Sequence, residues 1–339
     1  MTARAARALV CPGLAAALLI AAGAAITAEQ APSVQSPVVA TGAAVAHHVD
    51  RARLMAVVTR LASEEFQGRS AGSPGGIKAR QWIVEQFERI GLRPLGANGF
   101  LQPFAFVSRD RSAAGQPVQM SRDGANILGL EPGTTVGGTC IVVSAHYDHL
   151  GVRDGAIYYG ADDNASGVAV LLEVARWFAT HPPRHRLLFA AFDAEEQNLE
   201  GARVFVRSTL APLKTIGIDV NLDMVSRNDR NEIYAAGTFQ SPWLIPILAD
   251  VQQRAAVKIM LGHDRPPREA GGLEDWTQQS DHGAFHDAGL PFLYFGVEDH
   301  ADYHKPTDTA DKINPAFFGD TADMIVEAVA ALDVQMHGR

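Results

Sequence analysis

Hydrophobic residues recur at helical spacing in some segments of the chain and form short continuous runs in others. The helical spacing predicts helices at residues 49–63, 76–90, 168–180, 199–208, 243–253, 285–288 and 316–336. The continuous runs predict strands at residues 104–107, 126–130, 140–145, 186–192, 216–222 and 291–295. Because strands and helices alternate, we expect an α/β protein, a three-layer α/β/α sandwich with a central mixed, mostly parallel sheet.

The N-terminal residues have the pattern of a secretory signal. Arg4 and Arg7 precede an apolar run at 14–26, and small residues follow that run. A helix of this length is roughly 20 Å long, which is short for a hydrocarbon core of about 30 Å; an uncleaved anchor or a buried helix is the alternative. We expect a signal peptide at 1–28, a flexible segment at 29–46 and a single domain at 47–339. The mature protein would be secreted or periplasmic, without stable membrane association.

Charge and cysteine content exclude several classes of protein. The 339 residues include 38 acidic and 29 basic side chains, a formal net charge of −9, and no run of Lys and Arg. A nucleic-acid-binding surface needs clustered basic residues, so nucleic acid is not an expected partner. Two cysteines are too few for a disulfide scaffold or a cysteine-rich zinc module. Cys140 lies in an apolar run and is predicted to be a buried core thiol.

Polar residues with metal-binding chemistry follow the predicted strands. The strand at 140–145 leads into His146-Tyr147-Asp148-His149. In an extended segment His146 and Asp148 share a face, so one could bind a metal while the other supports it by a hydrogen bond. The next such segment, Gly-Ala-Asp-Asp-Asn-Ala-Ser-Gly at 160–167, precedes a predicted helix. Its two adjacent carboxylates exceed what a helix N-cap requires.

Three further acidic side chains and one histidine extend this pattern. Glu195 and Glu196 follow the strand at 186–192, and adjacent glutamates repel unless a cation is near or one is protonated. Asp223 follows the strand at 216–222, where a buried acid needs a cation or hydrogen-bond donors. His304 lies in a loop near the C-terminus. Each residue alone fits a cap, a solvated loop or a surface histidine, but carboxylates after three successive strands favour a metal centre.

In this order the segments resemble the M28 family of zinc peptidases, of the bacterial leucyl aminopeptidase type. The resemblance extends from residues 61–69 to the last helix. It rests on five ordered motifs: His146-Tyr147-Asp148, residues 160–167, Glu195-Glu196, Asn221-Leu222-Asp223-Met224 and Tyr303-His304-Lys305-Pro306. The resemblance implies a centre of two Zn ions. The implied ligands are His146, Asp163, Glu196, Asp223 and His304.

The resemblance also assigns a role to individual residues of these motifs. Asp163 would bridge the two ions, and we choose it over Asp162 because the family aspartate lies four residues before the closing glycine, here Gly167. Glu195 corresponds to the general base, and Asp148 to the acid that orients the first histidine. Imidazole and carboxylate ligands suit Zn²⁺ better than Mg²⁺ or Ca²⁺. Three ligating carboxylates and two Zn²⁺ would leave one positive charge, which helps to lower the pKa of a bound water.

The chain differs from some family members in two places. The stretch between Arg69 and His146 is too short to hold the protease-associated domain that some members insert there. His149 stands where the family often has Ser. In addition, the polar stretch 262–279 is long for a simple connection, and we expect it to form a rim over the site.

These observations lead to one expected function and three alternatives. We expect a secreted di-zinc exopeptidase, an aminopeptidase that hydrolyses N-terminal peptide bonds of a peptide substrate. One alternative is a di-zinc amidohydrolase or deacylase that acts on a non-peptide amide. The second is a relative of the single-zinc glutaminyl cyclases, which lack the full ligand set, and the third is a catalytically silent metal-binding domain.

Overall fold

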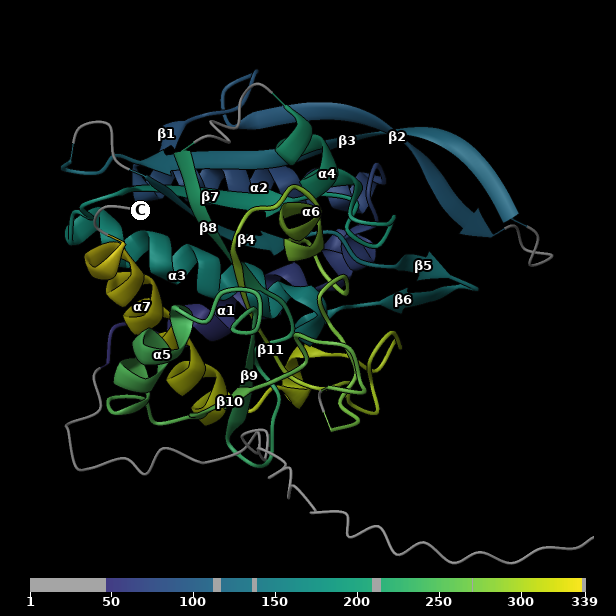
Figure 1. The fold of residues 1–339 in the computed structure, drawn as a ribbon. Coiled ribbons are helices and arrows are strands. Elements are labelled where there is room, and N and C mark those ends of the chain that lie inside the picture. The colour runs from purple at the N-terminus through teal and green to yellow at the C-terminus, as the bar shows by residue number, and fades with distance from the viewer. Residues whose placement is uncertain (1–46, 112–116, 136–138, 209–214, 270, 337–339) are drawn as a thin grey trace, which may run out of the picture. The chain divides into compact units, whose positions relative to one another are not determined.

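The main sheet in the computed structural model has nine strands, counted over residues 47–111, 117–135, 139–208, 215–269 and 271–336, which the structure describes (Figure 1). The strands are β1 (Arg93–Pro94), β2 (Leu101–Arg111), β3 (Pro117–Glu131), β4 (Cys140–His146), β7 (Arg186–Phe192), β8 (Ile216–Leu222), β9 (Glu232–Ala236), β10 (Lys258–Leu261) and β11 (Phe292–Gly296). They lie in the order β1-β3-β7-β4-β8-β11-β9-β10, and β2 pairs with β3. The short strands β5 (Gly151–Arg153) and β6 (Ala156–Tyr158) form a separate hairpin.

The four central strands of the sheet are parallel, and the strand on each side of them is antiparallel to its neighbour in this group. Strands β7, β4, β8 and β11 run parallel to their neighbours within this group. Strand β3 joins this group antiparallel on one side and β9 joins it antiparallel on the other. The expected mixed sheet is therefore confirmed. The carboxyl ends of the four parallel strands meet at one edge, where ligands bind in open α/β sheets.

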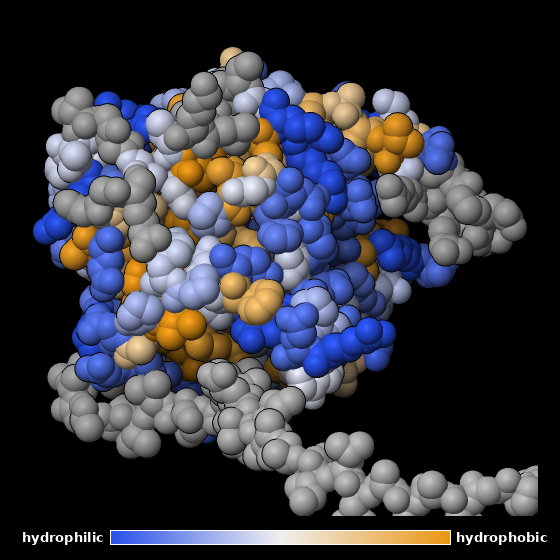
Figure 2. All heavy atoms as spheres, viewed as in Figure 1, coloured by the Kyte–Doolittle hydropathy of each residue, from blue (hydrophilic) through white to orange (hydrophobic). Residues whose placement is uncertain are grey.

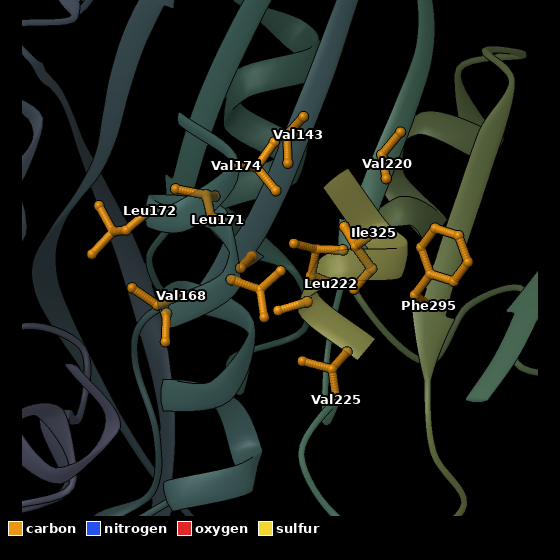
Figure 3. Close-up of a cluster of buried hydrophobic side chains, with 14 of the residues drawn as sticks. Val143, Val168, Leu171, Leu172, Val174, Val220, Leu222, Val225, Phe295 and Ile325 are labelled. Carbon is orange, nitrogen blue, oxygen red and sulfur yellow. The ribbon is translucent and has the colours of Figure 1, made fainter. Parts of the chain in front are cut away.

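Helices cover both faces of the sheet. They are α1 (Arg51–Leu61), α2 (Pro74–Ile90), α3 (Gly167–Thr180), α4 (Glu200–Arg207), α5 (Leu244–Gln252), α6 (His282–Asp287) and α7 (Pro315–Gln335), with short helical segments η1 (Glu64–Arg69), η2 (Ala161–Ser166) and η4 (Ala310–Lys312). Side chains of α1, α2, α3, α5 and α7 share one buried cluster with the sheet, part of which Figure 3 shows. Side chains of α4 and α6 share a second cluster with it. The expected three-layer α/β/α sandwich is confirmed.

Side chains of strand β4 point alternately to the two faces of the sheet, so this strand contributes to both buried clusters. Ile141 and Val143 belong to the cluster with α1, α2, α3, α5 and α7, whereas Cys140 and Val142 belong to the cluster with α4 and α6. Because successive side chains of a strand point to opposite faces, a continuously apolar strand needs cover on both sides. Cys140 is a free, buried cysteine, as predicted.

Local signals in the sequence account for the ends of the predicted helices. The Ser73 side chain accepts a hydrogen bond from the Gly76 N–H at the start of α2, and Gly91 ends that helix with a left-handed backbone, φ 90°.

All seven predicted helices are present. The last short one begins earlier than expected, because α6 covers His282–Asp287 rather than 285–288.

The strands were predicted less completely than the helices. Strands β2 and β3 form one long antiparallel hairpin that pairs Leu101 with Ile127 and continues through Val107 opposite Ser121. The predicted strands at 104–107 and 126–130 cover only its apolar parts. Strands β1, β5, β6, β9 and β10 were not predicted. Most of them are short and lie at the edge of a sheet, where backbone pairing does not require a long apolar run.

The surface of the described residues mixes hydrophilic and hydrophobic side chains on the face shown in Figure 2. The large hydrophobic side chains that are exposed come from different elements: Ile77, Val107, Met120, Val152, Phe239, Ile245 and Val334. None of the helices in the described part of the chain is long and apolar enough to cross a membrane. The expected signal peptide at 1–28 and the segment at 29–46 lie outside the described residues. All described residues belong to one structural unit.

Phe205 provides a test of the core on the α4 and α6 side of the sheet. Its buried ring lies 5.5 Å from the ring of Phe192 and 5.9 Å from that of Phe285, between centroids. We expect Phe205→Ala to lower the free energy of unfolding by about 3–5 kcal/mol, because it leaves a cavity. Val334→Ala, at an exposed position of α7, is the control and should change it by less than about 0.5 kcal/mol. Urea unfolding of both variants measures the difference, and equal values would contradict this account of the core.

Candidate metal centre

The predicted ligands lie beyond the carboxyl ends of the parallel strands, as expected from their positions in the sequence. His146 is the last residue of β4 and Asp223 follows β8. Glu196 lies in the turn after β7, and Asp163 in η2. His304 comes from the loop between β11 and α7. Five segments that are distant in sequence therefore contribute one side chain each, and the structure brings all five together.

Asp163 lies between two groups of side chains. Its Oδ1 is 3.5 Å from Nε2 of His146, and its Oδ2 is 3.1 Å from Nε2 of His304. On the first side, Asp223 Oδ1 is 3.3 Å from the same His146 nitrogen. On the second side, Glu196 Oε2 is 3.5 Å from the His304 nitrogen. Two atoms bound tetrahedrally to one Zn²⁺ lie roughly 3.3 Å apart, so both groups have the spacing of ligand atoms.

Asp148 contacts both the first histidine and the backbone of the candidate base. Its backbone carbonyl is 3.1 Å from His146 Nδ1, and its carboxylate Oδ1 is 3.7 Å from the same nitrogen. The Glu195 N–H donates to that carboxylate oxygen at 3.0 Å. The carbonyl of Asp148 is thus the nearer of the two oxygens to the imidazole, and the carboxylate, the group expected to orient His146, lies slightly farther away. The carboxylate also accepts the hydrogen bond from the turn that carries Glu195.

The pKa values of the side chains at the centre are shifted because several carboxylates are buried close together. Burial raises the pKa of Glu195 well above its ordinary value, while the charge of His146 opposes the shift. Burial also raises the pKa of Asp223, again with His146 opposing. Burial alone would lower the pKa of His146, but the charges of Asp223 and Glu195 raise it well above its usual value. Such a cluster is stabilised by positive charge placed among the acids.

Several buried polar atoms at the centre have no hydrogen-bond partner among the residues that the structure describes. They are Asp148 Oδ2, His149 Nδ1, His149 Nε2, Asp163 Oδ2 and Glu196 Oε1. Buried polar atoms are normally paired, so unpaired atoms on the three neighbouring side chains His149, Asp163 and Glu196 call for a ligand. A cation would satisfy the carboxylates and imidazoles alike, and this mixture of donors fits zinc.

The structure separates Asp163 from its neighbour Asp162. Asp162 Oδ1 accepts hydrogen bonds from the Ser226 backbone N–H at 2.9 Å and from its hydroxyl at 2.6 Å. Asp162 Oδ2 is 3.1 Å from His300 Nε2. The backbone N–H groups of both aspartates donate to the Asp308 carboxylate. Because the oxygens of Asp162 are occupied in this way, the geometry supports the choice of Asp163 as the ligand.

Arg69 connects the loops of the centre through hydrogen bonds to their backbone, a role that the sequence did not reveal. Its buried guanidinium donates hydrogen bonds to the backbone carbonyls of Leu61, Tyr147, Tyr159 and Gly160 at 2.6–2.9 Å. Two of these carbonyls belong to the segments that carry Asp148 and the 160–167 motif. Burial lowers the pKa of Arg69 to about 10, which leaves the guanidinium charged at neutral pH.

The polar stretch 262–279 packs beside the centre rather than only connecting two elements. Trp276 stacks on His263, with ring centroids 3.5 Å apart, and lies edge-on to Tyr294 of β11 at 5.9 Å. The Tyr294 hydroxyl donates to the backbone carbonyl of Asp223 at 3.2 Å. An aromatic cluster therefore links the stretch to one predicted ligand. This placement agrees with the expected rim, and residue 270 lies outside the described part.

Comparisons with known proteins agree with this picture. Residues 126–329 match the family described as Peptidase family M28. A probable zinc metalloprotease of Pyricularia oryzae is 27% identical over 82% of this chain and 61% of its own length. Aminopeptidase YwaD of Bacillus subtilis is 31% identical over 60% of this chain and 44% of its own length. The matched part of the chain thus spans 44% to 61% of the length of these two relatives.

A solved structure shows the same fold. The aminopeptidase from Aneurinibacillus sp. strain AM-1 superimposes with a TM-score of 0.68 at 18% identity, covering 83% of this chain and 93% of that one. The α/β/α architecture, the convergence of the five predicted ligands and the match over residues 126–329 lead to one assignment. The chain belongs to peptidase family M28.

Proposed function

We propose that the chain is a secreted di-zinc aminopeptidase that hydrolyses the N-terminal peptide bond of peptide substrates. The observation that carries the proposal is the position of Asp163, whose two oxygens face His146 and His304 from opposite sides. A carboxylate placed in this way is suited to bridging two ions. Similarity to a probable zinc metalloprotease and to an aminopeptidase supports the choice of metal and reaction. Secretion is proposed on the N-terminal sequence pattern alone.

The ligand groups divide between two sites. Asp163, Glu196 and His304 would hold one zinc ion, and Asp163, Asp223 and His146 the other. When bound, such a pair polarises the scissile carbonyl and lowers the pKa of the attacking water. The three ligating carboxylates carry less negative charge than two Zn²⁺ carry positive charge. The remaining positive charge would help to lower the pKa of that water.

Glu195 is the residue that we propose to move the proton. Its carboxylate lies beside His146 and Asp223, with one atom of each residue within 4.8 Å of the others. Burial raises the Glu195 pKa in the protein alone, and nearby cations would lower it, so the two effects oppose each other. A base with an intermediate pKa can accept a proton from water and return it to the leaving amine. The hydrogen bond from the Glu195 N–H to Asp148 fixes its backbone.

The free amino group of the substrate provides the test. We expect aminoacyl-anilides and dipeptides to be hydrolysed, while the N-acetylated forms of the same compounds react at least about 100-fold more slowly, the loss expected from an unrecognised charged group. A chelator should abolish turnover, and added Zn²⁺ should restore it. Initial rates on matched pairs of substrates measure both effects.

Other outcomes of this assay would point to other functions. Equal rates on free and N-acetylated substrates would contradict an aminopeptidase and favour a deacylase or amidohydrolase. Release of ammonia from a peptide with N-terminal glutamine, without peptide-bond cleavage, would favour a glutaminyl cyclase-like reaction. Absence of turnover in zinc-loaded, folded protein would favour a silent metal-binding domain.

A further inference from the structure

His149 is a buried histidine at the metal centre. It is not one of the five proposed ligands, and it takes no part in the proposed proton transfer. Its side chain is fully buried, and its Nδ1 lies 2.9 Å from Glu196 Oε1 and 3.6 Å from Asp163 Oδ2. Neither ring nitrogen has a hydrogen-bond partner among the described residues. The imidazole therefore faces two predicted ligands of one ion without being hydrogen-bonded to either.

We propose that His149 Nδ1 is a further ligand of the metal ion assigned to Asp163, Glu196 and His304. The inference rests on the proposed di-zinc centre. One atom each of His149, Asp163 and Glu196 lies within 4.8 Å of the others, which is the spacing of a metal-binding group. The set would then consist of two imidazoles and two carboxylates, a combination that suits zinc. His149 adds no charge, so the net charge of the centre is unchanged.

The short distance to Glu196 favours a shared ion over a simple hydrogen bond. At 2.9 Å the Nδ1 and Oε1 atoms are close enough for a hydrogen bond, yet the direction of the ring nitrogen does not satisfy one. Two donor atoms that are close but not aimed at each other have the arrangement of neighbouring ligands around a third atom. His304 approaches the same Asp163 oxygen, Oδ2, as His149 does.

The surroundings of His149 hold its ring in this position. Its ring is edge-on to that of His304, with centroids 5.9 Å apart. On another side lies Gly160, whose φ is +57° and where an added Cβ would come within 2.6 Å of the His149 ring. The absence of a side chain at Gly160 thus leaves the space that the imidazole occupies. The histidine is therefore built into the site rather than placed there by chance rotation.

Metal binding by His149→Phe tests the proposal, because phenylalanine keeps a ring but has no ligand atom. Loss of a residue that only supports a metal ligand typically weakens metal affinity by about 10–100-fold. Loss of a direct ligand should cost at least as much as the upper end of that range. We therefore expect one of the two Zn²⁺ ions to bind to His149→Phe about 100-fold more weakly, or weaker still. Competition with a chromophoric chelator and elemental analysis measure this. His185→Phe removes a buried histidine just before β7, at the opposite end of that strand from Glu196, and should retain both ions.

A cysteine at the same position distinguishes direct ligation from an indirect effect. Nδ1 is the ring nitrogen nearer to Cβ, so a cysteine sulfur in His149→Cys can reach the same ion. The Co²⁺-loaded variant should show a thiolate-to-cobalt charge-transfer absorption in the near ultraviolet. The Co²⁺-loaded unaltered protein, which contains the buried Cys140, should not show it.

The possible results separate this inference from the proposed function. If the unaltered protein binds two ions, and His149→Phe binds both with unchanged affinity while His149→Cys lacks the absorption, the inference is overturned and the di-zinc proposal stands. If the unaltered folded protein binds fewer than two ions, the di-zinc proposal fails, and the inference fails with it. Weaker binding by His149→Phe together with the cobalt absorption supports the inference.

Discussion

Glu195→Gln is expected to lower kcat by about 10²–10⁴-fold while both zinc ions stay bound. Glutamine keeps the size of the side chain and its ability to form hydrogen bonds, but it cannot accept the proton of the attacking water. Over that range the loss corresponds to about 3–5 kcal/mol of transition-state stabilisation. Steady-state rates, zinc content and thermal unfolding of the purified variant test it together.

The neighbouring residue supplies the matched control. Glu196→Gln removes a proposed ligand, so it should lower the zinc content of the protein rather than only the rate. The two glutamates are adjacent in sequence but contact different partners, since Glu196 lies against His304 and His149 while Glu195 lies beside His146. A Glu195→Gln protein that is fully active, or that has lost a zinc ion, would reverse the assignment of the pair.

Asp163→Asn is expected to weaken the binding of both zinc ions and to reduce turnover to the level of the chelator-treated protein. An amide is a much weaker zinc ligand than a carboxylate, and it removes one negative charge from between the two positive ions. His146→Ala should empty mainly one site, because that imidazole faces only the Asp223 side of Asp163. Elemental analysis of the two variants after dialysis measures the difference.

One result would contradict the bridging role of Asp163. If Asp163→Asn loses only one equivalent of zinc, Asp163 does not bridge, and Asp162 becomes the candidate bridging residue. That would require Asp162 to give up its hydrogen bonds with Ser226 and its contact with His300. The unfolding temperature of the variant shows whether the loop itself has been disturbed, because those contacts connect distant segments.

The sequence was sufficient to predict the layers of the fold and the side chains that converge at the centre. Strands such as β4 and β8 are short apolar runs that end in a polar residue, and this pattern places His146 and Asp223 at one edge of the sheet. Strand polarity alone predicts that the side chains after β4, β7 and β8 meet at this edge. The inclusion of Asp163 and His304, which lie in η2 and in a loop, came from the family resemblance.

Other features depend on contacts between residues far apart in sequence and could not be predicted in this way. The distinction between Asp162 and Asp163 arises from Ser226, His300 and Asp308, which lie well over 50 residues away. The polar ends of the β2–β3 hairpin are held by backbone pairing, which leaves no hydrophobic period in the sequence. His149 was visible as a departure from the family, but only the fold shows which ligands it faces.

The position of Arg69 determines how much of the chain an active fragment must include. Residues 126–329, which match the family, contain every proposed ligand and the proposed base, yet a fragment with these ends would lack Arg69. The carbonyls of Tyr147 and Gly160 would then lose their shared donor, and two loops of the centre would no longer be connected through one side chain. We therefore expect the smallest fragment that organises the proposed zinc ligands to begin at or before Arg69, although no proposed ligand lies there.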